Sequence, residues 1–445
     1  MSRLQQNTEM QIRVKPVIVL NKDENTFRRS DGTREIVSDR EAIALRVAQL
    51  SKDLREGLQF STALLEDAII RNEDDLANLK GEALKADALL LYLIGTMPLQ
   101  ALLQWGLPII AFSGQHAPTQ ALYAFGVERH SQPGITVALD FQDIDEEFQL
   151  LEARKKLQNT RIALFGFPPP IFSRWHHLPD LELAREKLGV EFSPVELREL
   201  VAKLPTIDQG EAQTVAKRWL REAKEVVEPS KTDVIETARL YLAIASILEQ
   251  EKANALAINC IEMMSSLKAL PPCYAMTRLR DEGIHAACEV DVIALLTMML
   301  LGYLTNKPAF MGNIVGTIPE SNILRISHCV VPTRMAGFSQ PPSRYTLRNY
   351  HGRRKGVTAH VELDTGQEVT IARLARDLDK IMLLSGELVD CRETIACRTT
   401  LSARVSDVRK FVRCAFGNHH VVICGNHTRQ AKALSQALGI SSVEL

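Results

Sequence analysis

The sequence predicts an α/β protein with two doubly wound parallel-sheet lobes followed by a C-terminal mostly β domain. Three observations lead to this prediction. The chain has 445 residues, which is too long for one ordinary hydrophobic core. In its earlier part, continuous apolar runs of strand length alternate with helical patterns, as is typical of parallel strands buried on both faces. From about residue 320 onward, β runs follow one another with turn residues between them.

The first lobe is expected over residues 1–157. It begins with a strand at 15–20 and continues with a long amphipathic helix at 40–71. Further apolar strands, separated by helical segments or turn residues, are expected at 87–95, 107–114 and 135–141. These runs carry no polar alternation, so both faces of the sheet should be covered by helices.

The second lobe is expected over residues 158–315 and the β domain over 316–445. A strand at 161–170 ends in three prolines, and a helix at 233–252 leads into a strand at 253–260. An apolar helix starts at Val292. The β domain contains runs at 322–331, 356–363, 368–374, 381–390 and 400–405, then a helix at 407–416, the strand that contains 421–424, and a last helix at 429–438.

Bulk composition restricts the class of protein. A formal charge of −1 and a pI near 6.8 argue against a general nucleic-acid-binding protein. The polar start of the chain and the lack of an apolar run of about 18 residues predict a cytoplasmic protein without a membrane segment. Eight scattered cysteines form no CxxC pair, which argues against disulfides and a zinc knuckle and favours small buried residues.

Three acidic residues are candidates for chemistry. Glu289 and Asp291 lie two residues apart just before the apolar helix, and Glu262 follows the strand at 253–260. Ligand sites of α/β sheets lie at the carboxyl ends of strands, which places Glu262 at a suitable edge. Each acid could instead complement a helix start. Buried carboxylates would need a cation or hydrogen-bond donors.

Three histidines complete the candidate set. His328 ends an apolar strand, where a structural role is the alternative interpretation. His419 and His420 stand at the head of the run Val421–Cys424. Adjacent residues of a strand point to opposite faces, so only one of this pair is expected to join a given site. Carboxylate and imidazole ligands without cysteine suit Mn²⁺ or a similar divalent ion.

A basic stretch accompanies these candidates. No acidic residue occurs between Glu320 and Glu362. The interval is either a solvated loop or a surface that binds an anionic group through arginine forks. Arg334, close to His328 in sequence, is the preferred substrate-binding candidate. The interval contains Arg325, Arg334, Arg344, Arg348, Arg353, Arg354 and Lys355.

Four motifs occur in an order that resembles the L-fucose/L-arabinose isomerase superfamily, in particular its shorter fucose-isomerase-like members. The first is DEGIHAACEVD at 281–291, followed by ALLT at 294–297. The turn PAFMGN at 308–313, the strand end His328-Cys329 and the terminal segment 417–427 (GNHHVVICGNH) follow. The resemblance covers roughly residues 255–445, whereas the N-terminal part shows only a compatible α/β layout.

The resemblance implies an aldose–ketose isomerase that uses a divalent metal, usually Mn²⁺, and acts through an enediol. It implies that Asp291 is a metal ligand and base, with Glu289 as its catalytic companion and Glu262 as the second metal-binding acid. His328 matches a histidine ligand. Of the terminal pair, His420 is favoured as the metal ligand and His419 as a substrate contact. Val290 stands where a glycine is common in the family.

The predicted activity is therefore an Mn²⁺-dependent aldose–ketose isomerase acting on a small-molecule sugar. The basic stretch favours an anionic sugar, sulfonated or phosphorylated. The alternative is a non-catalytic sugar-binding or regulatory protein on the same scaffold. The resemblance also implies a homo-oligomer, a trimer or hexamer. Neither nucleic acid nor a membrane is expected as a partner.

Overall fold

The computed structural model describes residues 11–28, 33–60, 63–112, 121, 124–125, 134–169, 176–353 and 355–445. Residues 1–10, Ser61, Thr62, Ser113, Gly114, Pro170 and Arg354, which belong to segments considered above, lie outside the described residues. The chain divides into two compact units, Met10–Glu152 and Ala153–Leu445. The three-domain division at residues 157 and 315 remains a prediction.

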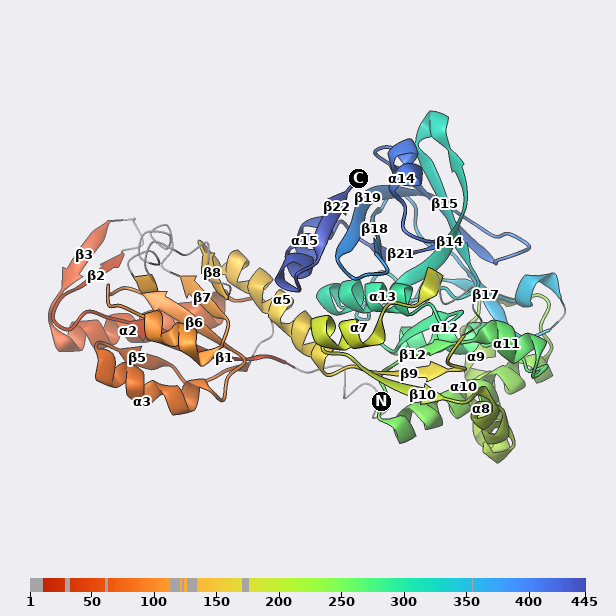
Figure 1. Ribbon diagram of the computed structural model, residues 1–445, viewed down its shortest axis with the longest axis horizontal. Helices are drawn as coiled ribbons and strands as arrows, with labels where there is room; N and C mark the ends of the chain where they lie inside the picture. The colour runs from red at the N-terminus through yellow and green to blue at the C-terminus, as the bar shows by residue number, and fades with distance from the viewer. Residues whose placement is uncertain are drawn as a thin grey trace. The chain divides into compact units, whose positions relative to one another are not determined.

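The smaller unit is built on a parallel sheet with strand order β4-β1-β6-β7-β8, in which β5 also pairs with β1 (Figure 1). Helices α2 (Arg40–Gly57) and α3 (Glu73–Ala83) belong to this unit, and α5 (Phe141–Gln158) runs across its boundary. Apolar residues from alternate positions of the central strands fill separate cores on the two faces of the sheet. The strands are β1 (Arg13–Val19), β4 (Ala63–Leu64), β5 (Ala68–Ile70), β6 (Ala88–Leu93), β7 (Ile109–Phe112) and β8 (Ile135–Ala138).

The helix expected at 40–71 is shorter than predicted. Helix α2 spans Arg40–Gly57, and Ala68–Ile70 form strand β5 beside β1. The amphipathic pattern does not reveal this parallel pairing, which joins positions about 50 residues apart. The chain also needs a small residue at the helix end, because a Cβ atom on Gly57 would lie 2.4 Å from the Phe141 ring.

The larger unit begins with a second parallel sheet, of strand order β10-β9-β12-β13. Its strands are β9 (Arg161–Phe165), β10 (Glu191–Val195), β12 (Ala255–Ile258) and β13 (His285–Cys288). Its helices include α7 (Leu181–Leu188), α8 (Leu197–Lys203), α9 (Gln209–Glu222), α10 (Lys231–Glu251), α11 (Cys260–Ser265) and α12 (Cys273–Asp281).

A closed antiparallel barrel follows the second sheet. Its strands run in the order β18-β21-β14-β15-β20-β19, and the pairing of β18 with β19 closes the ring. Closure leaves no unpaired edge among these six strands. Strand β22 (Ser441–Glu444) adds to β19 in parallel. The barrel consists of β14 (Phe310–Ile318), β15 (Ile323–His328), β18 (Glu368–Leu374), β19 (Lys380–Arg392), β20 (Thr399–Val405) and β21 (His419–Cys424).

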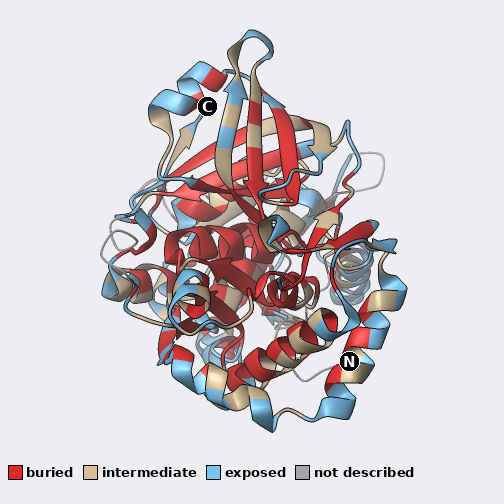
Figure 2. Ribbon diagram, turned by 90° about the vertical axis from the view of Figure 1, so that its right-hand side faces the viewer, coloured by how far each residue is buried: buried red, intermediate tan, exposed pale blue. Residues whose placement is uncertain are grey.

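Helix α13 (Val292–Thr305) connects the second sheet to the barrel. All of its residues from Val292 to Leu304 are buried, and it packs against β13, β18, β21 and α15 (Thr428–Ala437). Figure 2 shows buried residues concentrated in these central elements of the larger unit and exposed residues along the outer helices. The predicted fold class, parallel sheets flanked by helices and then a mostly β domain, is confirmed. None of the described helices has the length and apolar character needed to cross a membrane.

Candidate functional site

The acidic motif forms the tight connection between strand β13 and helix α13. Asp291 is the N-cap of α13, and its Oδ1 accepts a 2.7 Å hydrogen bond from the Ala294 N–H. Glu289 and Val290 have positive φ angles of 58° and 51°. Left-handed backbone costs a non-glycine residue about 1–2 kcal/mol. This strained turn brings the two neighbouring acidic side chains to the same histidine, His419.

His419 lies between the two carboxylates. Its Nδ1 is 2.9 Å from Asp291 Oδ2, which is a hydrogen-bond distance. Its Nε2 is 3.9 Å from Glu289 Oε2 and makes no hydrogen bond within the described part of the chain. The ring is fully buried. Hydrogen bonding at Nδ1 leaves Nε2 free to bind a ligand, since the Nδ1 proton is directed toward the carboxylate.

His420, the neighbour of His419, faces the other way. Its ring packs against Phe411 of α14 (Val408–Cys414), with ring centroids 5.0 Å apart. Burial lowers the pKa of His420 to about 3. The alternation of strand β21 therefore directs His419, and not the residue favoured at the sequence level, toward the acidic motif.

His328 approaches the same carboxylate from the end of strand β15. Its Nε2 is 3.9 Å from Glu289 Oε1, and its ring lies edge-on to the ring of His419 at 5.3 Å. Burial, helped by the nearby His419 and Arg280, holds the pKa of His328 well below its ordinary value. The imidazole is therefore neutral at neutral pH, and a neutral imidazole can donate a lone pair to a metal ion.

Asp291 is neutralised by a buried arginine. Arg373 Nη1 donates to Asp291 Oδ2 at 3.1 Å, and neither side chain is more than 1% exposed. Burial alone would raise the pKa of Asp291, but Arg373 and His419 outweigh it and lower the pKa. The guanidinium also donates to the carbonyls of His419 (2.6 Å) and His176 (2.9 Å). A Cβ atom on Gly417, whose φ is 64°, would lie 2.8 Å from this guanidinium.

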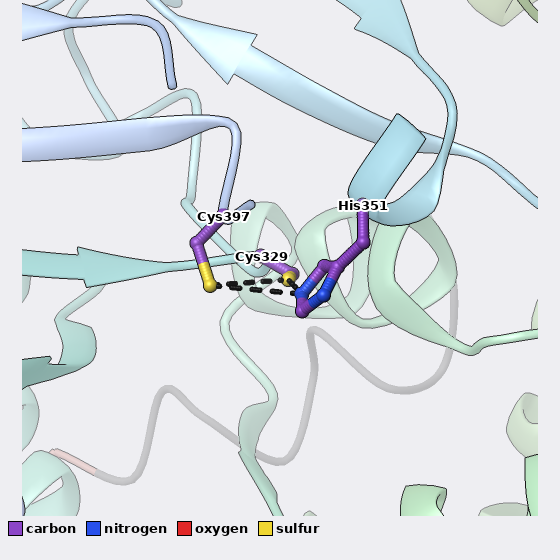
Figure 3. A group of neighbouring side chains, drawn as sticks. All are labelled: Cys329, His351 and Cys397. Atoms are coloured by element: carbon purple, nitrogen blue, oxygen red, sulfur yellow. Dashed lines mark hydrogen bonds between the residues drawn. The ribbon is translucent and has the colours of Figure 1, made fainter. Parts of the chain in front are cut away.

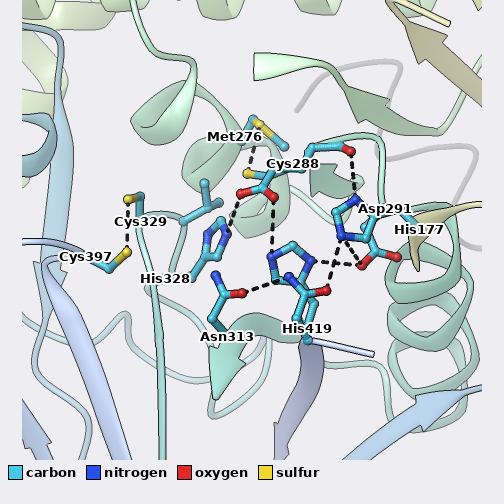
Figure 4. Close-up of polar contacts among 12 residues, drawn as sticks. His177, Met276, Cys288, Asp291, Asn313, His328, Cys329, Cys397 and His419 are labelled. Atoms are coloured by element: carbon cyan, nitrogen blue, oxygen red, sulfur yellow. Dashed lines mark hydrogen bonds and ion pairs between the residues drawn. The ribbon is translucent and has the colours of Figure 1, made fainter. Parts of the chain in front are cut away.

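His177 completes the cluster shown in Figure 4. Its ring stacks on His419, with centroids 5.2 Å apart. Its Nε2 lies 3.2 Å from Asn418 Oδ1 and 3.8 Å from Asp291 Oδ2. His177 and Arg373 were not among the residues predicted from the sequence. Two sequence features could have indicated them: the adjacent pair His176-His177, and the position of Arg373 inside the strand 368–374. An arginine that is buried in a strand requires an acidic partner.

Two overlapping groups in this cluster have ligand atoms within 4.8 Å of one another. One consists of Glu289, His328 and His419, and the other of His177, Asp291 and His419. The Arg373 guanidinium, 3.1 Å from Asp291, disfavours a cation in the second group because like charges repel strongly where water is excluded. The first group is therefore the better candidate.

The first group fits a divalent metal ion. The nitrogen–oxygen distances of 3.9 Å from Glu289 to both histidines are too long for hydrogen bonds. His419 Nε2 is buried without a hydrogen-bond partner among the described residues, which is costly unless a ligand satisfies it. Two imidazoles and one carboxylate with open positions suit Mn²⁺, Fe²⁺ and similar ions.

Two other candidates lie outside both groups. Glu262 lies in the first turn of α11, and its side chain accepts a 2.8 Å hydrogen bond from Nδ2 of Asn259, the N-cap residue of that helix. Arg334 donates its backbone N–H to Asp281, and its Nη1 donates to the carbonyls of Phe338 and Gln340 at 3.1 Å. The sequence roles given to Glu262 and Arg334 remain predictions.

Sequence comparisons show similarity to four sulfoquinovose isomerases, of which three illustrate the match. The one from Alkalicoccus urumqiensis is 23% identical over 316 residues, which is 67% of this chain and 68% of the relative. The one from Clostridium sp. (strain MSTE9) is 24% identical over 65% of this chain and 66% of the relative, and that of Priestia aryabhattai is 21% identical over 66% and 67%. No protein-family model matches the chain.

Proposed function

We propose that the chain is an aldose–ketose isomerase of the L-fucose/L-arabinose isomerase type, and that its substrate is a sulfonated sugar. The observation that carries the proposal is the convergence of Glu289, His328 and His419 from three distant segments. The names of the relatives support the reaction type and the sulfonated substrate. The acidic motif and the terminal histidine pair support the superfamily.

Glu289, His328 and His419 would hold a divalent ion, for which Mn²⁺ is our proposal. When bound, such an ion supplies Lewis-acid stabilisation of negative charge that develops on the sugar oxygens next to the moving proton. Asp291 does not need to touch the ion in this arrangement. It orients His419 through the 2.9 Å contact at Nδ1, as carboxylates commonly do for metal-binding histidines.

Proton transfer is assigned to Glu289. Its side chain is 24% exposed, whereas the Asp291 side chain is fully buried and held by three donors. A carboxylate that the substrate can reach is required to take the proton from the carbon beside the carbonyl. The protonated Glu289 then returns this proton to the neighbouring carbon of the enediolate, and the hydroxyl proton moves from one sugar oxygen to the other, which completes the exchange of aldose and ketose.

A substrate panel tests the reaction and the anion preference together. Purified protein is assayed with Mn²⁺ for ketose formation from sulfonated, phosphorylated, carboxylated and neutral aldoses of matched stereochemistry. We expect turnover of a sulfonated aldose and a kcat/KM at least about 100-fold lower for its neutral analogue, because the loss of a charged hydrogen-bonded group costs about 3 kcal/mol. Sugar binding without ketose formation at saturating metal would instead support the binding-protein alternative.

Adjacent histidines provide a matched pair of variants for the metal site. His419→Gln should weaken Mn²⁺ binding by roughly 100-fold or more, since even the loss of a residue behind a ligand typically costs 10–100-fold. His420→Gln should retain the wild-type affinity, because its ring packs on Phe411 on the other side of β21. Free Mn²⁺ is measured by electron paramagnetic resonance during titration. The reverse order of affinities would contradict the proposed ligand set.

A further inference from the structure

A second group of metal-binding side chains lies apart from the carboxylate site. Cys329 follows strand β15, His351 lies in the short 3₁₀ turn η6 (Tyr350–Gly352), and Cys397 precedes strand β20. Figure 3 shows the two thiols and the imidazole converging on one point. The Cys329 sulfur is 3.1 Å from His351 Nε2 and 3.6 Å from the Cys397 sulfur. The Cys397 sulfur is 3.7 Å from the same nitrogen.

These separations match the corners of a zinc coordination tetrahedron. Zinc binds sulfur at about 2.3 Å and imidazole nitrogen at about 2.0 Å. Tetrahedral angles then place two sulfurs about 3.8 Å apart and a sulfur and a nitrogen about 3.5 Å apart. The three observed distances, 3.6, 3.1 and 3.7 Å, lie within about 0.4 Å of these values. Little movement is needed to hold an ion.

The backbone around the group is positioned by other interactions. His351 has a φ of 47°, which is unusual for a non-glycine residue, and its ring stacks on Tyr350 at 4.0 Å. Glu228 accepts hydrogen bonds from the Asn349 N–H at 2.7 Å and from Arg398 Nη2 at 2.8 Å. One carboxylate therefore ties the segment before His351 to the segment after Cys397.

The chemistry of the donors differs from that of the isomerase site. Two thiolates and one imidazole are soft ligands that select zinc over Mn²⁺. His351 and Cys397 are partly exposed, so an ion can enter from solvent. A cavity of about 430 Å³ borders the His351 turn and is lined by Glu228, Ser230, Asp233, Asn349 and Gly352.

We propose that Cys329, His351 and Cys397 form a Zn²⁺ site whose fourth coordination position is open to water. The ion would join the ends of β15 and β20 to the η6 turn. Because Cys329 directly follows His328, zinc at this position would also brace the strand end that carries a candidate isomerase ligand. The proposal is independent of the isomerase activity, since its three ligands take no part in that site.

Cobalt titration of the full-length protein tests the proposal. The reduced, chelator-treated protein is first saturated with Mn²⁺ at the carboxylate site and then titrated with Co²⁺. We expect one equivalent of Co²⁺ to produce a thiolate-to-cobalt charge-transfer band in the near ultraviolet and tetrahedral bands in the visible. Zn²⁺ should abolish them. Only a sulfur-containing site can give the first band, so this readout is separate from catalysis.

Three variants identify the ligands. Cys397→Ser and His351→Asn should each weaken Co²⁺ binding at least about 100-fold; asparagine is chosen because it tolerates positive φ. Cys414→Ser removes a partly exposed thiol outside the group and should leave the band unchanged. Circular dichroism verifies folding of each variant.

Two outcomes would overturn the proposal. One is a folded wild-type protein with free thiols and no charge-transfer band, which would leave only a thiol–imidazole hydrogen-bond cluster. The other is a band that persists at wild-type strength in Cys397→Ser. The first outcome depends on the wild-type protein alone, so the test holds even if a variant fails to fold.

Discussion

Asp291 is a charged residue that is fully buried, and its neighbours explain why it remains ionised. Arg373 neutralises it at 3.1 Å, and the His419 Nδ1 is bonded to it at 2.9 Å. A buried carboxylate next to an arginine keeps a lowered pKa, so Asp291 remains ionised at neutral pH. The same contact sets the orientation of the imidazole that faces Glu289.

Asp291→Asn should therefore have two separable effects. The free energy of unfolding should fall by about 3–5 kcal/mol, because Arg373 is left buried and unpaired. The affinity for Mn²⁺ should fall about 10–100-fold, because His419 loses its orienting carboxylate. Urea unfolding of the metal-free protein and Mn²⁺ titration measure the two quantities.

A double variant separates charge balance from histidine orientation. Asp291→Asn combined with Arg373→Met removes both charges, so much of the lost stability should return. The affinity for Mn²⁺ should stay low, since the His419 imidazole still lacks the carboxylate that orients it. Wild-type metal affinity in Asp291→Asn would show that the carboxylate does not act through His419.

The connection between β13 and α13 is the element that organises the acidic motif. It reverses direction in three residues, and two of them, Glu289 and Val290, have left-handed backbone. Valine is β-branched and fully buried here, so it is an unfavourable residue for such a conformation. Strain of this kind persists where surrounding packing holds it, as the buried α13 does here.

Two substitutions at position 290 should reveal this strain. Val290→Gly and Val290→Ala both remove most of the buried side chain, but only glycine accepts positive φ freely. The free energy of unfolding of Val290→Gly should equal that of Val290→Ala or exceed it by up to about 1 kcal/mol. Glycine is ordinarily the less stable of the two by about 0.5–1 kcal/mol. Urea unfolding compares the pair, and the ordinary order would exclude strain at this turn.

At the scale of the whole molecule, the larger unit buries several neutral histidines. Burial lowers the pKa of His285 and of His420 to about 3, and it holds that of His328 far below its ordinary value. An exposed histidine in the unfolded chain has a pKa of about 6.5. Between these values the unfolded state binds more protons than the folded state. Stability is therefore full above pH 6.5 and is lost as the pH falls toward 3.

The metal-free protein should lose roughly 2 kcal/mol of unfolding free energy per pH unit between about pH 6 and pH 5. Three buried histidines contribute to this loss, and Asp281, whose pKa burial raises to about 6, opposes it. His285→Gln should reduce the slope by about 1 kcal/mol per pH unit, because one protonating histidine is removed away from the metal site. Urea unfolding at several pH values measures both slopes. Equal slopes would mean that His285 is protonated in the folded state.

Much of the fold could be predicted from local patterns. The apolar run 87–95 contains β6, because a continuous apolar segment of this length suits a parallel strand with both faces covered. The β run predicted at 368–374 matches β18. The prediction of a helix at 40–71 was wrong in its second half. The reason is non-local, because Ala68–Ile70 pair with strand β1. The closure of β18 on β19 also depends on long-range pairing and has no local pattern.

The sequence by itself determined the class of fold and the candidate segments: the acidic motif at 289–291, His328 and the pair His419-His420. Tertiary structure decided which members meet. The register of β21 directs His419 toward Glu289 and His420 away from it, and Arg373 arrives from a separate strand to neutralise Asp291. The physical reason is that periodicity reports which face of a strand is buried, whereas a site requires atoms from distant segments at fixed separations. The thiol pair Cys329 and Cys397, 68 residues apart in sequence and 3.6 Å apart in space, is the clearest example.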